Sequence, residues 1–149
     1  MKLQKDLRAF VELLIAKRVD FIIVGGHAVA YHGFPRFTGD IDIWVRPTIE
    51  NGERLVDVLA AFGFGDCGVS ASDFTIPERV VQLGTPPHRI DLLTSISAVE
   101  FSEAWDSRVN AALDGIGVSF LGRDALLRNK RAAGRAKDLA DIEELESKP

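Results

Sequence analysis

The stretch FIIVGGHAVAYHGFPRFTGDIDIWV, residues 21–45, decides the fold of this 149-residue chain. Its first four residues, 21–24, are apolar and predict a buried strand, and Gly25 and Gly26 follow at once. Residues 27–32 then predict a short helix. Glycines at a strand-to-helix turn let backbone N–H groups approach a phosphate closely. The turn is therefore a candidate phosphate site, with a tight turn of purely structural role as the alternative.

The end of the same stretch, residues 40–45, predicts a second strand. Side chains alternate between the two faces of a strand, so Asp40 and Asp42 share one face, opposite the apolar residues Ile41, Ile43 and Val45. Two carboxylates side by side repel each other unless a cation lies between them. The pair is therefore a candidate site for a divalent metal ion, and the alternative is the solvated face of an edge strand.

Composition and length predict one globular domain that spans residues 1–149. The chain is 46% hydrophobic and has one cysteine, Cys67, which rules out an intrachain disulfide and fits a reducing cytoplasm. We expect no signal peptide and no membrane-spanning segment, because no apolar stretch is long enough. The net charge of −4 argues against a general nucleic-acid coat, although a local basic surface remains compatible with it.

Periodicity along the rest of the chain predicts an α/β (α+β) fold, in which helices pack on a small mixed β-sheet. Thr48 is the expected N-cap of a helix over residues 49–62. Residues 79–83 and 88–93 predict two strands that pair as a hairpin. The other expected elements are helices over residues 3–18 and 100–113, a strand over 115–121, and closing helices over 123–133 and 136–145, within about 123–147.

The hairpin carries a third carboxylate, Asp91, in the run RIDLL. A candidate phosphate site so near a candidate metal site suggests a metal–nucleotide enzyme, and two divalent ions about 4 Å apart can stabilise negative charge that develops on phosphoryl oxygens. These ions need hard oxygen ligands on rigid elements. Asp91 is the best candidate to complete the set with Asp40 and Asp42, and Mg²⁺ is the expected ion, with Mn²⁺ as a substitute.

These motifs resemble the signature of the polymerase-β-like nucleotidyltransferase superfamily. Its elements are the Gly25-Gly26 pair, the run from Thr38 to Asp42 and the later strand carboxylate. Residues 129–141, NKRAAGRAKDLAD, are similar to the closing motif of a small bacterial subgroup related to abortive-infection (AbiEii-type) toxins. The chain has Ala136 where that subgroup leads us to expect proline.

The resemblance implies a minimal nucleotidyltransferase fold with catalytic, metal-binding Asp40, Asp42 and Asp91. It implies that Asp91 acts as the base for the attacking hydroxyl. The expected nucleotide-binding residues are Gly25, Gly26, Arg36, Thr38, Lys130, Arg135 and Lys137. The expected partners are a nucleoside triphosphate, an acceptor that is RNA, protein or a small molecule, and an antitoxin if the chain is a toxin.

Two other functions remain open from the sequence. A non-catalytic nucleotide-binding module would keep the glycine turn but would not need three carboxylates. An RNA-binding protein would use the basic residues 123–137 alone, with steep salt dependence and no need for Mg²⁺. A charged run of this kind is also typical of a solvated helix face.

Overall fold

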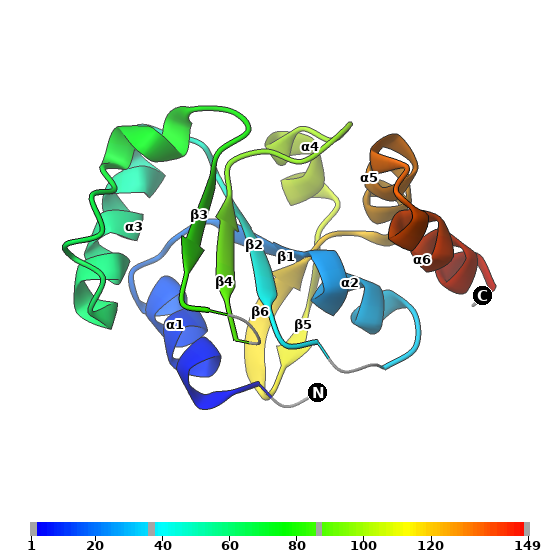
Figure 1. The fold of residues 1–149 in the computed structure, drawn as a ribbon, viewed down its shortest axis with the longest axis horizontal. Coiled ribbons are helices and arrows are strands. Elements are labelled where there is room, and N and C mark those ends of the chain that lie inside the picture. Colours follow the sequence, from blue (N-terminus) through cyan, green and yellow to red (C-terminus); the bar gives the residue numbers. More distant parts are fainter. Residues whose placement is uncertain (1–2, 36–37, 86–87, 148–149) are drawn as a thin grey trace.

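A six-stranded mixed sheet forms the centre of the computed structural model, which describes residues 3–35, 38–85 and 88–147 (Figure 1). The strands are ordered β3-β4-β2-β1-β6-β5 across the sheet. Their bounds are Phe21–Val24 for β1, Ile41–Val45 for β2, Val80–Leu83 for β3, Ile90–Leu93 for β4, Val109–Leu113 for β5 and Ile116–Phe120 for β6. The mixed sheet and its covering helices confirm the predicted fold class.

The pairing brings the end of one central strand beside the starts of two others. β1 runs antiparallel to β2, and β2 runs parallel to β4. The C-terminal end of β1 therefore lies at the same edge of the sheet as the N-terminal ends of β2 and β4. The glycine pair follows β1 directly, so this edge gathers the motifs of residues 21–45 together with Asp91.

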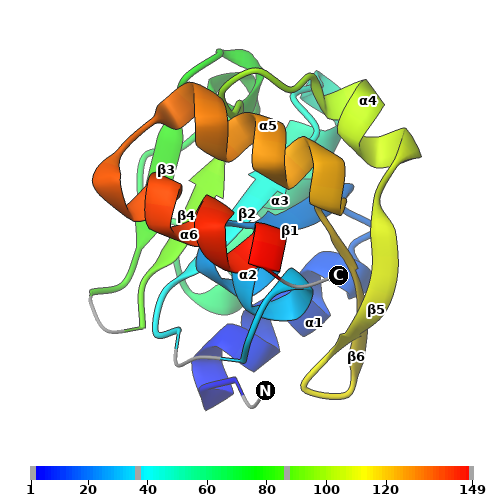
Figure 2. The same ribbon diagram turned by 90° about the vertical axis from the view of Figure 1, so that its right-hand side faces the viewer.

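Helices cover both faces of the sheet (Figures 1 and 2). α1 and α3 lie on one side, and α2, α5 and α6 lie on the other, with α4 near the end of β2. Their bounds are Lys5–Ala16 for α1, Gly25–His32 for α2, Ile49–Phe62 for α3, Phe101–Asp106 for α4, Arg123–Ala133 for α5 and Ala136–Ser147 for α6. A short 3-10 helix over Ala71–Thr75 packs against α3.

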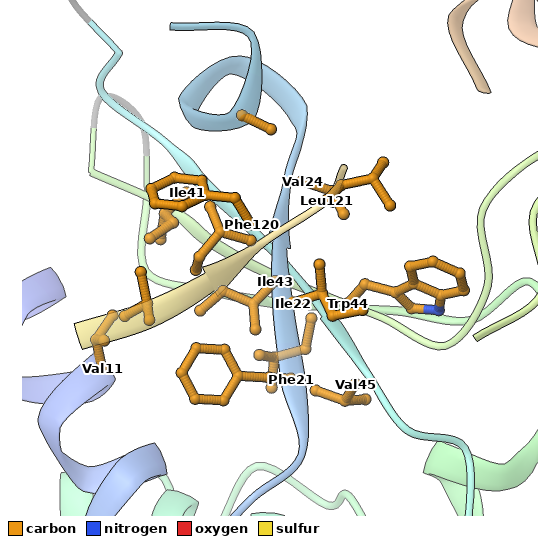
Figure 3. Close-up of a cluster of buried hydrophobic side chains, with 14 of the residues drawn as sticks. Val11, Phe21, Ile22, Val24, Ile41, Ile43, Trp44, Val45, Phe120 and Leu121 are labelled. Atoms are coloured by element: carbon orange, nitrogen blue, oxygen red, sulfur yellow. The ribbon is translucent and has the colours of Figure 1, made fainter. Parts of the chain in front are cut away.

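The core follows the predicted alternation of β2. Ile41, Ile43 and Val45 have no exposed surface and point toward the α1 and α3 side, whereas Asp42 points toward the other face. Figure 3 shows the apolar side chains of β1, β2 and β6 meeting in one cluster. Trp44 is 1% exposed and packs edge to face on Phe101 of α4.

The ends of α3 confirm the capping prediction. The Thr48 side chain accepts a hydrogen bond from the backbone N–H of Asn51, which satisfies one of the free donors at the helix start. Gly63 ends the helix in the left-handed conformation, with φ 96°. The closing helices α5 and α6 also form within the predicted range, and Gly134, with φ 63°, separates them.

The prediction of one helix over residues 100–113 is wrong. α4 ends at Asp106, and residues 109–113 form β5, which pairs antiparallel with β6. The two strands are joined by Asp114 and Gly115, whose φ angles are 51° and 79°. A two-residue Asp-Gly loop with both φ angles positive is the turn that matches the twist of a hairpin. This turn outweighs the four-residue spacing of apolar side chains that suggested a longer helix.

Within the described part of the chain, no helix combines the length and apolar character needed to cross a membrane.

Candidate nucleotide and metal site

One row of side chains crosses four neighbouring strands at the edge where the motifs meet. Val24 pairs with Asp42, Asp42 with Asp91, and Asp91 with Gln82 on the edge strand β3. Residues at paired positions of adjacent strands project to the same face of the sheet. The register therefore sets the Asp42 and Asp91 carboxylates directly beside each other, on rigid strands.

Burial and like charge both act on this carboxylate pair. Burial, followed by a hydrogen bond and repulsion from Asp91, raises the pKa of Asp42 to about 6. The positive charge of Lys137 opposes this shift. Near neutral pH the pair therefore holds negative charge at an energetic cost, which a bound cation would relieve.

Asp40 lies beside this pair and is held by Arg89. The backbone N–H of Arg89 donates a 2.9 Å hydrogen bond to Asp40 Oδ1, and Arg89 Nη2 lies 3.6 Å from Asp40 Oδ2. The same guanidinium donates from Nε to Asp91 Oδ1 at 2.8 Å and from Nη2 to Asp91 Oδ2 at 3.1 Å. Arg89 therefore connects two of the three predicted metal ligands.

The glycine turn approaches these carboxylates closely. Gly25 has a φ of 65°, and a Cβ added there would overlap Asp42 Oδ2. Gly25 is also the first residue of α2, and no described side chain caps that helix. The first N–H groups of a helix have no partner within it and attract anions. The start of α2 therefore provides free donors next to the acidic row.

A cavity of about 1100 Å³ joins these features. Nine of the ten predicted site residues line it: Gly25, Gly26, Thr38, Asp40, Asp42, Asp91, Lys130, Arg135 and Lys137. The tenth, Arg36, lies outside the described residues. Further lining comes from Val80 and Gln82 of β3, Leu93 of β4 and residues 95–97. The structure thus gathers residues that are up to 112 positions apart in the sequence, from Gly25 to Lys137.

The two C-terminal lysines differ in their surroundings. Lys130 is 5% exposed, and its Nζ lies 3.2 Å from both Asp138 Oδ1 and Asp141 Oδ2. Arg135 Nε donates to Asp138 Oδ2 at 2.7 Å. Lys137 is exposed at the cavity, where its charge reaches Asp42. Lys130 thus joins α5 to α6, and Arg135 pairs with the first turn of α6, whereas Lys137 faces the acidic row.

A family comparison agrees with this arrangement. Residues 2–146 match the model of a family described as "Nucleotidyltransferase of unknown function (DUF6036)". The chain belongs to this family. No curated protein matches the chain well enough to add a relative.

Solved nucleotidyltransferase structures share the fold. The lincomycin-bound lincosamide antibiotic adenylyltransferase LnuA superposes with a TM-score of 0.59 at 14% identity, over 99% of both chains. A putative nucleotidyltransferase from Thermotoga maritima gives a TM-score of 0.55 at 14% identity, over 95% of this chain and 86% of that one. An antigenic nucleotidyltransferase-like protein from Paracoccidioides brasiliensis gives 0.54 at 16% identity, over 97% and 76% of the two chains. These likenesses confirm the nucleotidyltransferase fold.

Asp40, Asp42 and Asp91 supply carboxylate oxygens at the cavity, which are ligands of the kind that a hard divalent cation prefers. In the side-chain positions of residues 3–35, 38–85 and 88–147, no three His, Cys, Asp or Glu residues are already grouped to hold an ion. Arg89 takes both oxygens of Asp91 and one of Asp40. The three carboxylates therefore offer the oxygen ligands that Mg²⁺ prefers, but in this arrangement the Arg89 guanidinium is hydrogen-bonded to the Asp91 oxygens.

Two residues of the site were missed by the sequence interpretation. Arg89 is two positions before Asp91, so strand alternation places both on one face, and this spacing was a usable signal. Gln82 faces Asp91 through the register of the β3–β4 hairpin, which spacing alone does not determine. His88 is exposed and is absent from the described lining of the cavity.

Proposed function

We propose that this chain transfers a nucleoside monophosphate from a nucleoside triphosphate to an acceptor hydroxyl. The acceptor oxygen forms a bond to the α-phosphorus, the bond between the α-phosphorus and the β-phosphate oxygen breaks, and pyrophosphate is released. The observation that carries the proposal is the Asp42–Asp91 pair, which lies in one cavity with the uncapped start of α2. An acidic pair suits a divalent cation, and free backbone N–H groups suit phosphate. A site that holds both is suited to a metal-bound triphosphate.

The proposed cation is Mg²⁺, or Mn²⁺ in its place, with Asp40, Asp42 and Asp91 as ligands. When bound, it would supply positive charge to the phosphoryl oxygens at which negative charge develops. The N–H groups at Gly25 and Gly26, the Thr38 hydroxyl and the charges of Arg135 and Lys137 would orient the triphosphate. Asp91 Oδ would accept the proton of the attacking hydroxyl, which is the role that the family resemblance implies for the third carboxylate.

Lys130 has a supporting part in this proposal. Lys130 lines the cavity, and its ammonium group also forms ion pairs with the buried carboxylates of Asp138 and Asp141. These contacts fix the turn at Gly134, from which Arg135 and Lys137 project. Lys130 therefore positions the other two cations, in addition to its own charge near the nucleotide.

For the acceptor we favour a small hydroxylated molecule. Small-ligand pockets usually measure about 300–1,000 Å³, so the cavity has room for a nucleotide and a small acceptor together. The described lining carries no aromatic side chain, whereas proteins that hold single-stranded nucleic acid use aromatic stacking. The fold likeness to LnuA, a lincosamide antibiotic adenylyltransferase solved with lincomycin bound, supports the same choice. An RNA or protein acceptor, a toxin role and an antitoxin partner are the other outcomes of the test.

The test is incubation of the protein with each α-labelled nucleoside triphosphate, Mg²⁺ and a cell extract divided into small-molecule and macromolecular fractions. We expect label in the small-molecule fraction, with loss of transfer in EDTA and in Asp42→Asn and Asp91→Asn. Asp57→Asn on the exposed face of α3 is the matched control and should retain transfer. Nucleotide binding without transfer to any fraction would favour a binding module, and full transfer by both site variants would contradict the assignment.

A further inference from the structure

The Arg89 guanidinium occupies the place where the proposed cation would bind. It forms two hydrogen bonds to Asp91, at 2.8 and 3.1 Å, and lies 3.6 Å from Asp40 Oδ2. A bidentate arginine takes up one lone pair on each of the two carboxylate oxygens, on the side where a chelating ion would also bind. In the described arrangement, Arg89 is thus the positive charge that neutralises Asp91 and part of Asp40.

A divalent ion and this guanidinium compete for the same atoms. Mg²⁺ binds oxygen ligands at about 2.0–2.1 Å with near-octahedral geometry, which leaves no room for a donor on the same lone pairs. The two positive charges also repel each other at such short range. Binding of the ion to Asp91 from this side therefore requires the guanidinium to leave.

The surroundings of Arg89 allow that movement. Its side chain is 29% exposed, compared with 7% for the Lys130 side chain in its buried ion pairs. Its backbone N–H donates to Asp40 Oδ1 independently of the guanidinium. The side chain can therefore swing away while this backbone hydrogen bond keeps Asp40 oriented.

We propose that Arg89 is an exchangeable counter-ion, which neutralises Asp91 and Asp40 in the metal-free protein and is displaced when the divalent cation binds. This proposal rests on the metal site in the proposed function. Arg89 is then a positioning residue that sets the affinity for the ion. It keeps three neighbouring carboxylates compatible with the fold before substrate arrives. The cost of displacing it lowers the affinity for the free ion.

A purely supporting role for Arg89 predicts the opposite sign. If the guanidinium only orients Asp91 as a ligand, its loss should weaken metal binding, as loss of an outer-shell partner typically does by about 10–100-fold. If it is a competitor, its loss should strengthen metal binding. Metal affinity therefore separates the two roles without any measurement of transfer.

The experiment titrates Mn²⁺ alone, without nucleotide, into the parent and into Arg89→Met at pH 8, by calorimetry and by the electron paramagnetic resonance of free Mn²⁺. Methionine keeps an unbranched side chain without the charge. We expect Arg89→Met to bind Mn²⁺ about tenfold tighter or more, because a positive charge a few ångströms from the ion is removed. Arg79→Met is the matched control: Arg79 lines the same cavity but pairs with Asp73 and not with the acidic row. Its Mn²⁺ affinity should stay close to that of the parent.

The outcomes separate this inference from the metal site itself. Equal or weaker Mn²⁺ binding by Arg89→Met, with binding by the parent, overturns the exchange and leaves the metal site in place. An equal gain in Arg79→Met also overturns it, because the gain would then reflect net charge alone. No Mn²⁺ binding by any of the three proteins overturns both the inference and the metal site.

A second measurement uses the parent protein and does not depend on the folding of a variant. In protein labelled with ¹⁵N-arginine, the Arg89 Nε–H signal is assigned by its absence from Arg89→Lys. We expect saturating Mg²⁺ to shift this signal and to speed its exchange with water, since the hydrogen bond to Asp91 is lost. A signal that stays unchanged while Mg²⁺ shifts the Asp91 backbone amide overturns the exchange.

Discussion

Replacement of Asp42 by asparagine should stabilise the metal-free protein at alkaline pH, although it removes a residue of the proposed site. Asp42 lies beside Asp91 in the strand register, within a cavity that also holds Asp40. Asparagine keeps the shape of the side chain and removes one of the three neighbouring charges. The free energy of unfolding should therefore rise wherever Asp42 of the parent is ionised.

The size and pH range of the effect follow from the raised pKa. Burial, with Asp91 as the second cause, raises the pKa of Asp42 from 3.8 to about 6. Because the folded-state pKa exceeds the unfolded one, the stabilising contribution of Asp42 is complete below pH 3.8 and is lost as the pH rises through 6. Two pKa units correspond to roughly 3 kcal/mol. We expect Asp42→Asn to exceed the parent by about 1–3 kcal/mol at pH 8 and to be near parity at pH 4.

The measurement is urea unfolding of both proteins in EDTA at pH 4, 6 and 8. Asp57→Asn, which removes an exposed carboxylate from α3, is the control and should stay within about 0.5 kcal/mol of the parent at pH 8. The reasoning fails if Asp42→Asn is less stable than the parent at pH 8, or if its advantage does not shrink toward pH 4. With Mg²⁺ in place of EDTA, the parent should gain more stability than Asp42→Asn, because the ion binds its folded state.

Three further predictions concern other parts of the cavity. Gly25→Ala should lower the unfolding free energy by at least about 1–2 kcal/mol, because Gly25 has a positive φ and the new Cβ would overlap Asp42. The same substitution should weaken nucleotide binding, and an unchanged nucleotide affinity by calorimetry would contradict this prediction. Lys130→Met should cost about 3 kcal/mol, because Asp138 and Asp141 lose a buried ion-pair partner while Arg135 stays paired with Asp138. Lys137→Met should leave urea unfolding nearly unchanged and weaken nucleotide binding by about 1–3 kcal/mol. Burial lowers the pKa of His27 from 6.5 to about 4, so the stabilising contribution of neutral His27 should be complete above pH 6.5 and lost as the pH falls through 4. His27→Gln should lose less unfolding free energy than the parent over this pH range, and identical pH profiles of the two proteins would refute this prediction.

Strong local signals explain which elements could be predicted from the sequence. The apolar run of β1, the alternation of β2 and the Thr48 cap of α3 each depend on nearby residues, and all three form as expected. The helix over residues 100–113 failed because two local signals compete there. Its apolar spacing fits a helix, but the Asp114-Gly115 turn fits a hairpin, and the turn also gains the ladder of β5 with β6.

The candidate site could be predicted as a set of residues but not as a set of contacts. Lys130 and Lys137 were treated alike, because both are cations in one motif. The αL turn at Gly134 then places Lys130 between two buried carboxylates and leaves Lys137 exposed at the cavity. Sequence spacing does not carry this difference, since it depends on how α5 and α6 fold back on each other.

The acidic residues show the same limit in the sheet. The predicted strand over residues 40–45 places Asp40 and Asp42 on one face, although β2 begins one residue later, at Ile41. Only the register with β4 shows that the close neighbour of Asp42 is Asp91. The same register sets Gln82 beside Asp91 on the edge strand, on the side away from Asp42. The row thus runs from the apolar Val24 through two carboxylates to an exposed amide. Our proposed function puts the triphosphate near the start of α2 and Lys137, which face the Asp42 end. On that proposal, an acceptor hydroxyl would approach Asp91 from the Gln82 end, away from the phosphates.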